Sequence, residues 1–116
     1  MKVIHYTDIP GLSYNAETVK NVTGRVAIGK DDGAPHFCMR LFTIGAGGHT
    51  PRHFHEWEHE IFVHSGKGQV FREGQWTDIH PGTAIFIPGG EEHQLRNTGS
   101  EDFTFLCLIP QGVPEL

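Results

Sequence analysis

Four histidines have spacings that suit a shared metal ion. His53 and His55 are two residues apart, so on a β-strand both imidazoles point to the same side. His59 follows after three intervening residues, and His93 stands at the start of a second expected strand. Neutral imidazole suits manganese, iron, cobalt, nickel, copper and zinc, whereas calcium and magnesium prefer oxygen ligands. The other histidines have no partner in register, and we predict that they lie outside the site: His5, His36, His49, His64 and His80.

All four histidines fall on a two-part sequence pattern. Residues 47–66 have the pattern Gly-x5-His-x-His-x3-His-x6-Gly, which resembles the first cupin motif with one change. Residues 82–97 have the pattern Gly-x5-Pro-x-Gly-x2-His-x3-Asn, which matches the second cupin motif at every position. The resemblance implies an all-β double-stranded β-helix, the jelly-roll barrel of the cupins. It also implies that His53, His55 and His93 are metal ligands.

The one change lies at the fourth ligand position, where the family usually has glutamate and this sequence has His59. The motif spacings to His55 and Gly66 both select residue 59. Glu60 is the alternative ligand, while Glu58 is expected to be solvated. We therefore predict a four-histidine site, which resembles the small manganese-associated cupins of the conserved-barrel type. Manganese and iron are the expected metals, with nickel, zinc, cobalt and copper as further candidates.

Four neutral ligands would leave the charge of a divalent ion uncompensated, which favours an anionic or readily deprotonated oxygen ligand. A six-coordinate ion would keep two positions for water, substrate or dioxygen. If His59 faces inward, alternation places Ile61 and Val63 inward as well, and with Leu95 and the last strand they predict an apolar pocket. We predict a metal-dependent enzyme of dioxygenase type that acts on a small oxygen-rich molecule. The alternatives are a non-catalytic small-molecule sensor, or an oxalate-decarboxylase-like enzyme or isomerase.

Several other residues could contribute chemistry, but a structural role is the expected one for each. Arg40 and Arg52 could each anchor a substrate carboxylate, yet arginines are mostly solvated and we expect the same here. Cys38 and Cys107 lie far apart within apolar segments, which predicts two buried, reduced thiols. Trp57 and Trp76 are expected to pack rather than to bind substrate.

The elements that must position the histidines are short β-strands. No segment has the apolar periodicity of a substantial amphipathic helix, and 15 glycines and 7 prolines provide many turns. No linker or charge run interrupts the chain, so residues 1–116 are expected to form one cupin domain. The turn signals are Asp31-Asp32-Gly33, Gly45-Ala46-Gly47-Gly48, Ser65-Gly66-Lys67-Gly68, Glu73-Gly74, His80-Pro81-Gly82, Pro88-Gly89-Gly90 and Asn97-Thr98-Gly99.

Two expected strands, residues 84–87 and 103–109, carry apolar side chains on both faces. In a short chain without covering helices, a second copy is the expected cover, so we predict a homodimer. The formal net charge of −5 argues against nucleic acid and anionic membranes as partners. No apolar run is long enough to span a bilayer, and the N-terminus lacks a signal-peptide core, so the cytoplasm is the expected compartment.

Overall fold

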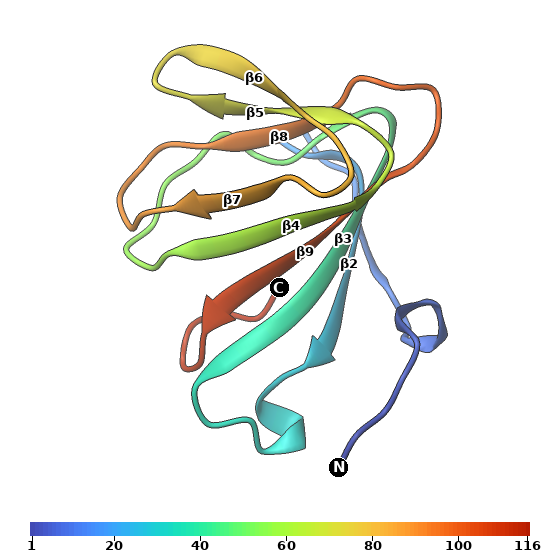
Figure 1. Cartoon of the computed structure of the whole chain (residues 1–116), viewed down its shortest axis with the longest axis vertical. Helices are drawn as coiled ribbons and strands as arrows, with labels where there is room; N and C mark the ends of the chain where they lie inside the picture. The colour runs from blue at the N-terminus through green and yellow to red at the C-terminus, as the bar shows by residue number, and fades with distance from the viewer.

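Strands and tight turns account for nearly all of the regular structure in this chain (Figure 1). The structure is a computed structural model that describes all 116 residues. Its two helices are 3-10 turns of three residues each, η1 (Tyr6–Asp8) and η2 (Lys30–Asp32). None of its helical segments has the length and apolar composition that a membrane crossing requires. The strands are β1 (Leu12–Tyr14), β2 (Lys20–Ile28), β3 (Phe37–His49), β4 (His59–Ser65), β5 (Gly68–Arg72), β6 (Gln75–Ile79), β7 (Ala84–Ile87), β8 (Gln94–Asn97) and β9 (Phe103–Pro110).

The strands form one curled antiparallel sheet with the order β6-β5-β8-β3-β9-β4-β7, and β2 and β1 extend it from β3. The 13-residue strand β3 links the two halves of the barrel. It pairs with β9 from Phe37 to Ile44, and its last residue, His49, pairs with Arg96 on β8. The all-β jelly-roll architecture expected from the sequence is therefore confirmed.

Alternation along the strands separates the inside of the barrel from the outside. On β4, His59, Ile61 and Val63 are buried, whereas Glu60 and Phe62 are exposed. The same alternation on β9 turns four of its side chains into the core. The core cluster is Val22, Cys38, Ile44, Ile61, Val63, Val70, Ile79, Ile87, Leu95, Phe103, Phe105, Cys107 and Ile109.

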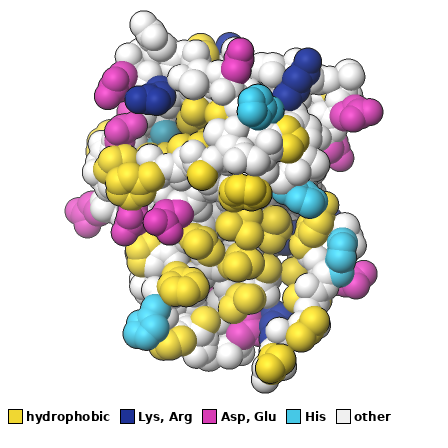
Figure 2. Space-filling view, in the orientation of Figure 1, with side chains coloured by type: hydrophobic (Ala, Val, Ile, Leu, Met, Phe, Trp, Pro, Cys, Tyr) yellow, Lys and Arg dark blue, Asp and Glu magenta, His cyan; other side chains and the backbone are white.

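The outer face of the sheet formed by β3, β9, β4 and β7 is largely apolar, with exposed Glu60 placed between Leu108 and Phe86. Leu106 pairs with Phe62 across this face, and Leu108 lies next to it along β9. Phe62 is 49% exposed and Phe86 on β7 is 60% exposed. Hydrophobic side chains gather over these strands in the space-filling view (Figure 2). The chain itself provides no helix to cover them.

Two turn glycines have almost the same backbone conformation but different surroundings. Gly66, between β4 and β5, has a φ of 77°, and Gly74, between β5 and β6, has a φ of 79°. A methyl group at Gly66 would overlap the main chain of Asp102 and Phe103, whereas one at Gly74 would meet nothing within 4 Å. The turn after β4 therefore requires glycine for packing as well as for its left-handed conformation.

We expect Gly74→Ala to lower the free energy of unfolding by about 1 kcal/mol, the usual strain of a left-handed alanine. Gly66→Ala should lower it by at least about 3 kcal/mol, because the overlap adds to the same strain. Urea unfolding of both variants measures the difference. Equal decreases in the free energy of unfolding of the two variants would contradict this prediction, because they would show that the main chain at Asp102 moves away without cost.

Candidate metal centre

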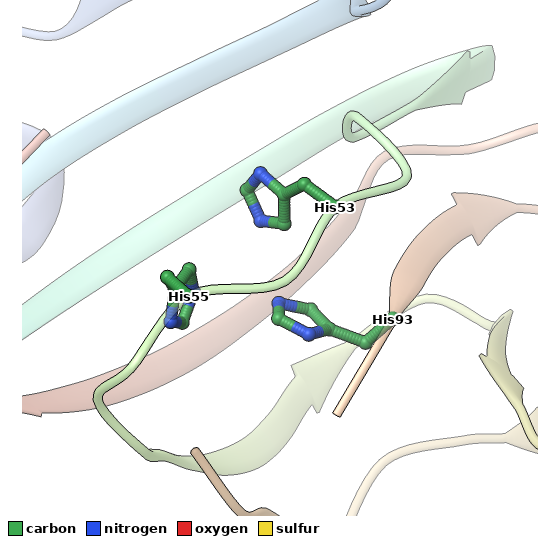
Figure 3. A group of neighbouring side chains, drawn as sticks. All are labelled: His53, His55 and His93. Carbon is green, nitrogen blue, oxygen red and sulfur yellow. The ribbon is translucent and has the colours of Figure 1, made fainter. Parts of the chain in front are cut away.

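His53 and His55 lie in the segment between β3 and β4, and His93 immediately precedes β8 (Figure 3). His53 forms an isolated antiparallel bridge with His93, so the expected strand at residues 53–55 is reduced to this single pairing. The amide of His53 donates to the carbonyl of His93 at 3.1 Å, and the amide of His93 donates back at 2.9 Å. This bridge brings together two residues that are far apart in the chain.

His53, His55 and His93 extend into the same space, and one ring nitrogen of each lies within 4.8 Å of the others (Figure 3). The ring centroids of His53 and His93 are 4.8 Å apart, and those of His55 and His93 are 5.1 Å apart. Imidazole nitrogens bind first-row transition metals at about 2.0–2.1 Å, so ligands of one ion lie up to about 4 Å apart. The three histidines need only small side-chain adjustments to share an ion.

Main-chain carbonyls orient two of these rings. His55 Nδ1 lies 2.8 Å from the carbonyl oxygen of Trp57, and His93 Nδ1 lies 2.8 Å from that of Glu91. A carbonyl only accepts, so each Nδ1 donates its proton and each Nε2 keeps a free lone pair. The indole of Trp57 also stacks on His55 with centroids 4.3 Å apart. An outer carbonyl of this kind is the usual support of a metal-binding histidine.

The expected fourth residue, His59, lies beside this cluster, although the group in which one ring nitrogen of each residue lies within 4.8 Å of the others contains only His53, His55 and His93. Its ring centroid lies 5.0 Å from that of His93, and its Nε2 lies 2.8 Å from Nε2 of His55. Two nitrogens bound at right angles to one ion are about 3 Å apart, so this separation is compatible with a shared ion. Glu60, the alternative ligand, is exposed on the opposite face of β4, and Glu58 is exposed as expected.

Loss of solvation favours the neutral form of three imidazoles at this site, those of His53, His59 and His93. It lowers the pKa of His59 from 6.5 to about 3, with a further contribution from the nearby positive charge of Arg40. Burial also lowers the pKa of His93, and it lowers that of His53 to about 4 together with the charges of His93 and His55. Neutral imidazoles keep the lone pairs that a metal requires at physiological pH.

The expectation that Arg40 is solvated was wrong, because only 7% of this residue is exposed. Its Nη2 lies 3.3 Å from Nδ1 of His59 and donates to Sγ of Cys107 at 3.0 Å. The sequence did contain an indication that Arg40 is buried, because alternation along β3 gives it the same orientation as buried Cys38. Arg52 is exposed as expected, and its guanidinium lies 3.9 Å from the ring centroid of Phe71.

A pocket of about 430 Å³ opens onto the histidines, and most of its lining is hydrophobic. Ile61, Leu95, Phe105 and Cys107 line it, in agreement with the apolar pocket predicted from the strand faces. Val63 does not, because it is completely buried in the core. Cys38 and Cys107 are both buried free thiols. A mostly apolar cavity with a few convergent polar groups is typical of a small-molecule site.

The neutral cluster predicts that the metal-free protein is destabilised by acid. The unfolded chain takes up protons near pH 6.5, whereas His59 in the folded chain stays neutral down to about pH 3. The unfolded state then binds more protons, so the free energy of unfolding falls as the pH is lowered from 7 to 4, by on the order of 3 kcal/mol for His59. His53 is exposed to water, so its contribution to the pH dependence of the free energy of unfolding should be smaller than that of His59.

Urea unfolding of chelator-treated protein at each pH checks this, with His59→Gln as the variant that should flatten the dependence. His64→Gln is the matched control, because His64 lies on the same strand and is exposed. Equal pH dependence in the wild type and His59→Gln would contradict the prediction.

Curated proteins similar to this chain have diverse activities. The chain is 30% identical over 71 residues to the 1-methylthio-D-xylulose 5-phosphate methylsulfurylase of Rhodospirillum rubrum, covering 61% of this chain and 46% of that protein. It is 35% identical over 80 residues to the oxalate-binding protein of Thermotoga maritima, covering 66% of each. The chain thus spans less than two thirds of the length of these relatives.

Among solved structures, the polyketide cyclase RemF from Streptomyces resistomycificus is 38% identical, with a TM-score of 0.88 over 95% of this chain and 79% of that one. A predicted oxalate decarboxylase from Thermotoga maritima is 25% identical, with a TM-score of 0.83 over 95% and 99% of the two chains. Residues 40–109 match the family model described as the cupin domain, which is more than half of the chain. The chain therefore belongs to the cupin family.

Proposed function

We propose that this cupin is a metal-dependent enzyme that closes rings in a hydrophobic, carbonyl-rich substrate of the polyketide type. The observation that carries the proposal is the apolar pocket of about 430 Å³ that ends on the histidine cluster. The similarity to the polyketide cyclase RemF, at 38% identity over 95% of this chain, supports the same class of substrate. It leads us to prefer cyclisation over the dioxygenase reaction expected from the sequence.

The pocket fits the other substrates of similar proteins less well. Oxalate is a small, fully polar dianion, and it would leave the walls formed by Phe42, Trp57 and Phe105 without a partner. A sugar phosphate needs a hydrogen-bonding group for each of its hydroxyls, yet 11 of the 19 lining residues are hydrophobic. A flat molecule with an apolar body and a few carbonyl oxygens can contact the hydrophobic walls with its body and the histidine cluster with its oxygens.

We propose His53, His55, His59 and His93 as the ligands of one divalent ion, with manganese or iron as the first candidates. The ion would act as a Lewis acid on substrate carbonyl oxygens. The carbonyls of Trp57 and Glu91 hold two of the imidazoles in position before any ion arrives. The apolar walls hold the substrate in a bent shape and exclude water, so that distant carbons of one chain meet.

We also propose that the protein is a homodimer that buries the outer face of β4, β7 and β9. Leu106 and Leu108 are half-buried and Phe62 and Phe86 are exposed on this face. An apolar row that crosses several strands is unusual on a monomer surface. Two copies related by a two-fold axis would cover it with the same residues from each side.

The proposed function is tested with a phenyl-capped linear triketone, which closes to a phenylresorcinol by forming one carbon–carbon bond and losing water. Protein from its native host should contain a stoichiometric divalent metal and form this product. Removal of the metal, or His93→Ala, should lower the rate roughly 100-fold or more. His59→Ala should lower metal affinity, whereas Glu60→Ala should not, because Glu60 faces away from the pocket.

Other outcomes would contradict this assignment. Ligand binding without product would support the sensor alternative, and oxygen consumption would support the dioxygenase. Loss of metal in Glu60→Ala with retention in His59→Ala would overturn the proposed ligand set.

The dimer is tested by light scattering at micromolar concentration, where we expect twice the mass of the chain. Phe62→Lys and Phe86→Lys should shift the protein towards monomer, because each places a charge inside the buried face. Leu12→Lys is the control, since Leu12 is 53% exposed on β1, away from this face. A wild type that is only monomeric would dismiss the proposal.

A further inference from the structure

Arg40 carries a buried positive charge whose partners are all neutral. Its Nη1 donates to the main-chain carbonyl of Glu115 at 3.1 Å, and its Nη2 contacts Cys107 and His59. Its Nε is buried and has no hydrogen-bond partner. A thiol is a weak acceptor compared with a carboxylate, and a neutral His59 that bound a metal through Nε2 would carry its proton on Nδ1, where it could not accept from Arg40. The guanidinium is therefore incompletely satisfied.

No carboxylate of the chain compensates this charge. The only salt bridge in the structure joins Lys2 to Asp32. Glu115 is the acidic residue that touches Arg40, but its carboxylate accepts from the amide of Lys30 at 2.8 Å instead. None of the residues that line the pocket is aspartate or glutamate, although Arg40 itself lines it. An unpaired buried charge is costly, and a bound anion would remove much of this cost.

We propose that the pocket takes its substrate as an organic anion, whose carboxylate or enolate oxygens pair with Arg40. The apolar body of this anion would lie against Phe42, Phe54 and Trp57, which line the same pocket. This inference rests on the proposed function and deepens it, because it states the charge and the chemical class of the substrate. A polyketide-type molecule supplies such oxygens readily, since a β-dicarbonyl ionises to an enolate.

The position of Arg40 suits this role. Its Nη2 lies 3.3 Å from Nδ1 of His59, so an anion held there lies beside the histidine cluster. Its carbon Cζ lies 4.9 Å from the ring centroid of Phe42, so charged and aromatic contacts are adjacent in one pocket. The planar fork of a guanidinium matches the geometry of two oxygens on one carbon. Arg40 is thus a specificity residue that distinguishes anions from neutral molecules of the same shape.

The test compares naphthoate with naphthamide, which have the same size and aromatic body but differ in charge. Calorimetric titrations use the full chain, as purified and after chelator treatment. We expect naphthoate to bind at least about 10-fold more tightly than naphthamide in both forms. In the chelator-treated form, Arg40→Gln should reduce this ratio to near one, and Arg40→Lys should retain part of it because the charge remains. Arg96→Gln is the control, since Arg96 stacks on Trp76 outside the pocket and the ratio should not change.

Equal binding of the two probes to the wild type would overturn the inference, even if Arg40→Gln failed to fold. An anion preference that survives in folded, chelator-treated Arg40→Gln would overturn it as well. The chelator-treated protein separates this inference from the proposed function. An anion preference in a protein that carries no metal when purified from its native host would support the role of Arg40 and contradict the metal-dependent enzyme. Cyclase activity of a metal-loaded protein without the anion preference would support the enzyme and contradict the role of Arg40.

Discussion

The site depends on the pairing of two chain segments through their main chains. The bridge between His53 and His93 is one part of this contact, and the amide of Thr50 donates to Leu95 at 2.9 Å on one side of it. On the other side, the amide of Gly90 donates to the carbonyl of His55 at 2.7 Å. Each bond contributes only about 1 kcal/mol, but together they fix where the imidazoles meet. Side-chain attraction could not do this, because the neutral rings have little affinity for one another without an ion.

This main-chain pairing explains why so much of the site could be predicted from the sequence. Strand alternation is a local property, and it correctly placed His59, Ile61 and Val63 on the inner face of β4. The glycines that permit the tight turns are also local, as Gly66 shows. Motif spacing adds the distance between two segments that must pair. Together these features fix the barrel and the convergence of His53, His55 and His93.

The rest of the pocket depends on contacts that no local pattern contains. Tyr14 and Val19 reach it from the N-terminal region, while Pro114 and Leu116 reach it from the other end of the chain. Their positions follow from how the last residues fold back, which strand periodicity does not specify. The burial of Arg40 was missed for a different reason. Alternation indicated an inward side chain, but the strong preference of arginine for solvent favoured the opposite prediction.

The histidine at the fourth position of the first motif and the unpaired charge of Arg40 belong to one arrangement. Nδ1 of residue 59 lies 3.3 Å from the guanidinium, so a glutamate at this position would place a carboxylate close to Arg40. The single negative charge of that carboxylate would offset part of the positive charge of the arginine and of a bound metal. With His59, the charge of Arg40 and the full charge of a bound divalent metal would both be directed at the pocket, inside a protein whose formal net charge is −5. On the proposed function, the departure from the usual cupin motif therefore favours an anionic ligand, in a pocket whose lining contains no aspartate or glutamate.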